Sequence, residues 1–158
     1  MIVWQQSQRF NSQALTRFLE VKLILDKEML FEGKENTMAV NLKEFTQEGV
    51  KLDIMVGGKI TGKITGQIMT THNALMKPDG TGSADVRSVI FSNGEMILMM
   101  GKATGKLVDP TPIEKIEENV TFMTTSKNLA YLNTTKGWID ASYNLATGEY
   151  MLKVYAVK

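Results

Sequence analysis

The stretch GGKITGKITGQIM, residues 57–69, decides the fold because it admits two opposite interpretations. Up to Gly62 and Lys63 it matches most of the phosphate-binding pattern G-x-x-x-x-G-K-[ST]. The next residue is Ile64, so the hydroxyl that would hold magnesium is missing, and no helix start follows the lysine. Isoleucine and glycine instead alternate with lysine and threonine, which is typical of a β-strand. The stretch therefore predicts one continuous strand and excludes a nucleotide loop.

Two glycines, Gly62 and Gly66, fall on the same face of this predicted strand. Glycine inside a strand usually marks a bend, a bulge or the close approach of another group. The pair therefore indicates either close packing in a strongly coiled strand or room for a ligand on that face.

The same alternation recurs along most of the chain, bounded by glycine, asparagine and aspartate, and predicts about nine strands. The alternation is found in ten segments, two of which, 49–56 and 57–69, are adjacent: residues 19–25, 37–45, 49–56, 57–69, 83–91, 95–101, 119–125, 129–135, 138–145 and 149–157. Residues 71–82 read as a loop that contains His72. The pattern predicts an all-β antiparallel protein, either a sandwich or a closed barrel.

One short helix interrupts the predicted strands. Thr111 can cap it, Pro112 takes the first helical position, and Glu114 completes a Thr-x-x-Glu capping box. The charged side chains that follow read as its solvated face. Residues 1–18, rich in glutamine, serine and asparagine, form an N-terminal arm, and residues 19–158 form a single domain.

The composition excludes several classes of function. With 18 basic and 17 acidic residues, the net charge of +1 creates no basic field for nucleic acid or anionic lipid. The absence of cysteine excludes disulfides and thiolate sites, and the single His72 excludes a site built on several histidines. We expect no metal and no cofactor. No secretory signal or membrane-spanning run is visible, so we expect a cytoplasmic protein that does not contact membranes.

Asn93 and Gly94, between two apolar segments, are a strong signal for a two-residue hairpin turn. This turn pairs Asp85 with Lys102 and places Arg87 on the same face, near one end of the hairpin. In one interpretation Asp85 forms an ion pair with Arg87 or Lys102 near a barrel rim. In the other, Arg87 faces the lumen and holds a ligand carboxylate or enolate through its planar two-point donor, and Asp85 orients it.

Three further residues are candidates for a site. Tyr131 and Asn133 share a face of the strand predicted at residues 129–135. In one interpretation both side chains point into the lumen and bind a carbonyl or an oxyanion, and in the other both reach solvent. His72 is the one side chain that ordinarily titrates near neutral pH, so it is a formal general base, although a lone loop histidine is commonly just exposed.

Three short motifs together resemble a bacterial and fungal family that is known only as a domain of unknown function. They are the glycine–isoleucine strand at residues 58–64, the Asp85-Val86-Arg87 strand, and the segment with Thr124, Thr125 and residues 131–133. The resemblance covers residues 19–158. It implies a calycin-like β-barrel similar to that of allene oxide cyclase, and a homo-oligomer. Residues 69–74 depart from the family's usual Gly-Asp-Trp-like element, and Tyr131 stands where a tryptophan is usual, which puts the shape of the pocket in doubt.

These observations lead to three functional hypotheses. The first is a pocket in the barrel mouth for a small, partly apolar organic molecule, with a carboxylate as one group it could carry. The second is a cofactor-free lyase or isomerase in the same pocket, with Arg87 and Asn133 stabilising negative charge and His72, Asp85 or Tyr131 moving a proton. The third is a structural or partner-binding module that uses residues 1–18. The fold alone does not separate them.

Overall fold

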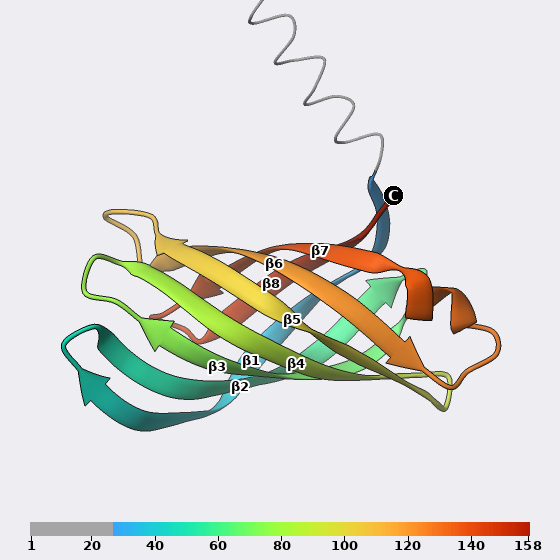
Figure 1. Cartoon of the computed structure of the whole chain (residues 1–158), viewed down its shortest axis with the longest axis horizontal. Helices are drawn as coiled ribbons and strands as arrows, with labels where there is room; N and C mark the ends of the chain where they lie inside the picture. The colour runs from blue at the N-terminus through green and yellow to red at the C-terminus, as the bar shows by residue number, and fades with distance from the viewer. Residues whose placement is uncertain (1–26) are drawn as a thin grey trace, which may run out of the picture.

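The computed structural model describes residues 27–158, which form a closed antiparallel barrel of eight strands (Figure 1). Each strand pairs with the next in sequence, and β8 pairs back with β1. The elements are β1 (Lys27–Thr46), β2 (Gly49–Gly62), β3 (Gly66–Met76), β4 (Thr81–Ser92), β5 (Glu95–Leu107), β6 (Ile113–Thr124), the 3-10 helix η1 (Ala130–Thr134), β7 (Lys136–Asn144) and β8 (Glu149–Val157). The all-β barrel prediction is confirmed, and the sandwich is excluded. The arm predicted at residues 1–18 and the strand predicted at 19–25 lie outside the described residues.

The glycine stretch is β structure as predicted, but it forms two strands and not one. β2 ends at Gly62, whose φ of 144° few side chains adopt, and β3 begins at Gly66 after a turn at residues 63–65. A Cβ on Gly66 would lie 1.9 Å from the carbonyl oxygen of Phe91 on β4. This favours close packing of neighbouring backbone over clearance for a ligand. Ile64, in the turn, still points inward and is buried.

The hairpin of β4 and β5 has the predicted turn and register. Asn93 and Gly94 both have positive φ, at 51° and 79°, as a two-residue hairpin turn requires. Asp85 pairs with Lys102, as expected. The face that carries Val86, Ser88 and Ile90 is buried in the lumen, whereas the face with Arg87 and Phe91 is on the outside.

Three other local predictions are wrong. Residues 71–76 continue β3, so the loop is confined to residues 77–80. No helix starts at Thr111, because its hydroxyl donates to the Val108 carbonyl at 2.6 Å within a turn and the chain then enters β6. The strand predicted at residues 129–135 is replaced by η1. The single short helix of the described chain is therefore a 3-10 turn at a different place.

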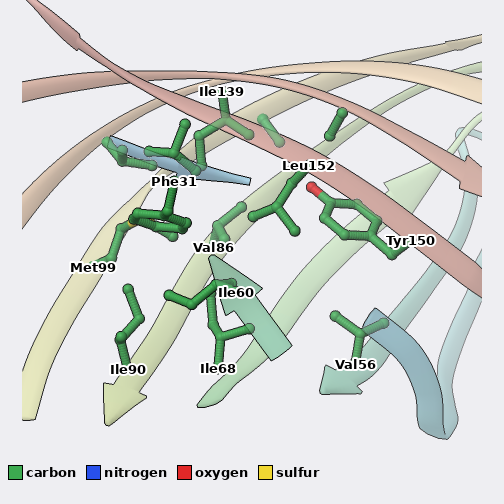
Figure 2. Packing of buried hydrophobic residues seen from close by; sticks show 14 of the residues in the cluster. Phe31, Val56, Ile60, Ile68, Val86, Ile90, Met99, Ile139, Tyr150 and Leu152 are labelled. Atoms are coloured by element: carbon green, nitrogen blue, oxygen red, sulfur yellow. The ribbon is translucent and has the colours of Figure 1, made fainter. Parts of the chain in front are cut away.

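The two ends of the barrel differ. At the end that carries η1, Leu132 and Ile64 are buried and close the lumen. Apolar side chains from every strand fill the interior behind them, and Figure 2 shows the Tyr150 ring, with its hydroxyl oxygen, among them. The opposite end, where the loops at residues 77–80 and 108–112 lie, is hollow. Within residues 27–158 no helix is long and apolar enough to cross a bilayer.

Candidate functional site

A cavity opens at the hollow end of the barrel. It contains about 480 Å³ of empty space including its mouth, of which about 40 Å³ can hold the centre of a water molecule. Because one water needs roughly 10–15 Å³ of such space, the inner part is narrow. Its walls are mainly apolar. Its polar lining includes His72, Glu114, Tyr143 and Tyr150, which come from four different strands, and Ser83 and Thr104 lie at its exposed edge.

Three buried polar side chains meet at the inner end of this cavity. The Tyr150 hydroxyl of β8 donates a hydrogen bond to Oε1 of Glu118 on β6. His72 Nε2, on β3, lies 3.5 Å from the same oxygen but makes no hydrogen bond. The His72 and Tyr150 rings are 5.1 Å apart. Burial, and then the charge of Glu118, raise the pKa of the Tyr150 phenol well above its usual value, so Tyr150 remains a donor.

Glu35 of β1 lies behind this trio, paired in register with Tyr150. Its side chain is fully buried, and neither carboxylate oxygen makes a hydrogen bond. Burial is the main cause that raises the pKa of Glu35 to about 8. The nearby Thr70 hydroxyl lowers this pKa in part, and the charge of Glu118 raises it further. Glu35 therefore carries its proton at neutral pH, next to a second buried carboxyl group.

Glu114 lies at the rim of the cavity, at the start of β6. Its carboxylate rests on the bare backbone of two paired glycines, since a Cβ on Gly105 would come within 2.2 Å of Oε1 and one on Gly82 within 3.1 Å. Burial raises the pKa of Glu114, and the charge of His72 lowers it in part. The side chain is half-buried, so it can meet a molecule that enters from solvent.

Most of the predicted site residues lie away from this cavity. Arg87 faces the outside, so the expectation that it points into the lumen is wrong. Asp85 and Lys102 form an ion pair of 2.9 Å on the outer wall. Tyr131 is exposed on η1, and Asn133 bonds the backbone of Thr124 through both ends of its amide, which fastens η1 to β6. Neither reaches the lumen, because residues 129–135 do not form a strand.

His72 is the predicted site residue that does line the cavity, although in a strand and not in a loop. The sequence interpretation missed Glu35, Glu118 and Tyr150. A signal existed for the latter two: Ile116, Glu118, Val120 and Phe122 alternate on one face, as do Tyr150, Leu152 and Val154. Among residues 27–158, no three histidine or carboxylate side chains are placed to hold a metal ion.

No protein-family model and no curated protein matches this chain. Solved structures do resemble it. A β-barrel-like protein from Acinetobacter baumannii has a TM-score of 0.72 at 21% identity, over 84% of this chain and 95% of that chain. A protein of unknown function from Clostridium acetobutylicum has a TM-score of 0.73 at 18% identity, over 84% and 99%. An enzyme from Penicillium herquei has a TM-score of 0.62 at 20% identity, over 84% and 93%.

At these identities the likeness shows the fold alone. It agrees with a resemblance to uncharacterised barrel proteins, whereas the relation to allene oxide cyclase stays a prediction. The chain thus shares its fold with proteins that include some of unknown function.

Proposed function

We propose that this protein binds a small, partly apolar organic molecule in the open mouth of its barrel. The observation that carries the proposal is the cavity itself, an apolar recess with an unpartnered histidine nitrogen, His72 Nε2, at its buried end. Ligand sites are typically concave and mostly apolar, with a few polar groups that orient the ligand. The expectation that the ligand carries a carboxylate loses its main support, because Arg87 and Lys102 lie on the outer wall.

Filling the cavity tests this proposal. Ala103 of β5 is buried in the cavity wall, so Ala103→Phe places a ring where a ligand would sit. We expect a panel of small amines, alcohols and acids to contain members that raise the melting temperature of the wild type but not of Ala103→Phe. A ligand at a hundredfold excess over its Kd adds about 2.7 kcal/mol of stability.

Two variants control for unfolding and for the site of the added ring. Met100→Phe adds a ring to the outer face of the same strand and should leave the melting shifts intact. Ala84→Leu, also in the cavity wall, is a milder block if Ala103→Phe does not fold. Equal melting shifts in the wild type and in a folded, filled variant would contradict the proposal.

A cofactor-free lyase or isomerase is the second candidate. The observation that favours it is that one oxygen of Glu118 accepts a hydrogen bond from the Tyr150 hydroxyl and also lies 3.5 Å from His72 Nε2, so a proton could pass between these groups. An identified ligand incubated in D₂O with the protein would gain deuterium at carbon if the site moves protons. Unchanged ligand would leave binding as the function.

We further propose that the outer wall associates with a second copy of this chain. Large apolar side chains that are more than two-fifths exposed gather on the outside of β2 to β6: Met55, Met69, Phe91, Met96, Met100 and Met123. Apolar patches of this kind commonly mark interfaces, and dimers usually pair the same surface twice. A partner-binding role for residues 1–18 remains a separate hypothesis.

A charge placed in this outer face should separate the copies. We expect the wild type to sediment as a dimer or larger and Met69→Glu with Met100→Glu to sediment as a monomer, because each subunit would then bury unpaired carboxylates. Lys153→Glu, an exposed change on β8, should leave the assembly intact. A monomeric wild type at high protein concentration would contradict the proposal.

A further inference from the structure

Three carboxyl groups reach the lumen or its mouth, and no arginine or lysine of residues 27–158 does. Glu35 and Glu118 are buried inside the barrel, and Glu114 lies at its mouth. In the described residues Arg87 and the lysines lie on the outside or at the ends of the barrel, and none lines the cavity. Glu35 holds its proton at neutral pH, so the carboxylate that a ligand meets at the cavity is that of Glu114, with no arginine or lysine of the described chain beside it in the lining. A ligand anion would meet like charge there, whereas a cation would meet opposite charge.

The hydrogen-bonding groups of the cavity favour a donor in the ligand. The Tyr150 hydroxyl already donates its proton to Glu118, so its oxygen can only accept from a ligand. A Glu114 carboxylate also only accepts. His72 Nε2 is buried and unpartnered at the same place. An ammonium group, which has N–H donors and no acceptor, complements such a set.

Aromatic rings add to the attraction for a cation. Tyr143 and Tyr150 both line the cavity with ring centroids 6.3 Å apart, and the His72 ring lies against Tyr150. The faces of tyrosine rings attract ammonium groups, and this attraction grows when the groups are removed from water. Apolar side chains such as Ile54, Val56 and Ile116 form the rest of the wall, so the remainder of the ligand should be apolar.

We propose that the barrel mouth selects a compact apolar molecule that carries a protonated amine. The amine lies between the Glu114 carboxylate and the tyrosine rings, and the apolar body lies against the isoleucine and valine side chains. This inference rests on the proposed function and names the chemical class of its ligand. The narrow inner cavity limits the ligand to a slender group.

Benzylamine, benzyl alcohol and benzoate form a matched set of probes, since they share a ring and differ mainly in charge. Their Kd values can be measured by NMR titration of the full-length protein. We expect benzylamine to bind about tenfold more tightly than benzyl alcohol, which corresponds to about 1.4 kcal/mol. Benzoate should bind most weakly of the three.

Glu114→Gln tests the charge at the rim, because it keeps the size of the side chain and removes its negative charge. It should raise the Kd of benzylamine about tenfold, as expected for the loss of a charged hydrogen bond, and leave the Kd of benzyl alcohol unchanged. Glu117→Gln is the matched control, since Glu117 is exposed on the outer face of the same strand. It should change neither Kd.

The outcomes separate the amine inference from the proposed function. If benzoate or benzyl alcohol binds as tightly as benzylamine, and Ala103→Phe abolishes that binding, the cavity binds ligands but the amine inference is wrong. An unchanged benzylamine Kd in Glu114→Gln also overturns it. If none of the three probes binds, the amine inference falls, and the wider panel then decides the proposed function by itself.

Discussion

Glu35→Gln should make the protein more stable than the wild type at pH 8.5, although it removes a buried ionisable group. The pKa of Glu35 is about 8 in the folded protein, against 4.5 for the free side chain, because burial disfavours its charged form. The folded state therefore holds a proton that the unfolded state releases. The stability that protonated Glu35 contributes is fully present below about pH 4.5, and it is lost as the pH rises to about 8. In Glu35→Gln this loss is absent.

The expected size is large. Each unit of pKa difference corresponds to about 1.4 kcal/mol, so the unfolding free energies of wild type and variant should diverge by a few kcal/mol between pH 5 and 8.5, and at most by about 5. Urea titrations at several pH values measure this difference. The groups around Glu35, namely Glu118, Tyr150 and Thr70, are present in both proteins.

Glu32→Gln is the control for the pH experiment. Glu32 lies three residues away on β1 but faces solvent, so its variant should follow the wild-type curve. Parallel curves for Glu35→Gln and the wild type would mean that water or a neighbour solvates the buried carboxyl. A carboxyl group held without partners in a core is a cost that proteins commonly carry at functional sites. This is a reason to place the function of the barrel in its lumen.

Local patterns predicted the strands well but not which face of each strand is inside. The turn at Asn93 and Gly94 sets the register of its hairpin through its own backbone geometry, so the pairing of Asp85 with Lys102 could be predicted. Both faces of this hairpin are apolar, however. The outer face carries Phe91 and Met100, whereas the inner face includes Ser88. Hydrophobicity alone therefore gave no reason to place Arg87 outside.

The buried acidic residues were hidden by a competing local signal. Thr111 and Glu114 have the spacing of a helix cap, and this made Glu118 look like part of a solvated helix face. Pairing with β5 and β7 over the whole length of β6 overrides that local preference. Because this pairing joins residues far apart in sequence, the meeting of His72, Glu118 and Tyr150 could not be inferred from any one segment.

Tyr150→Phe should lower the unfolding free energy by about 3 kcal/mol, since a buried carboxyl group left without its hydrogen bond costs roughly 1–3 kcal/mol or more. The hydroxyl is the one hydrogen-bond donor that the described residues offer to Glu118, and His72 at 3.5 Å makes no bond in its place. Tyr143→Phe is a matched control. It removes the hydroxyl of a second tyrosine in the same cavity, whose partner is the neutral hydroxyl of Thr37 at 2.9 Å. Its expected loss is about 1 kcal/mol.

A double-mutant cycle shows whether the loss belongs to the Tyr150–Glu118 contact. If it does, Glu118→Gln should make Tyr150→Phe less harmful, with a coupling energy above about 1 kcal/mol between the two positions. Additive losses would mean that the Tyr150 hydroxyl stabilises the barrel through contacts other than the one with Glu118. In that case the Tyr150 hydroxyl would not be engaged by Glu118 and could donate to a ligand carbonyl, and the cavity would no longer select for an amine. The cycle therefore tests the fold's central polar contact and the ligand chemistry inferred from it.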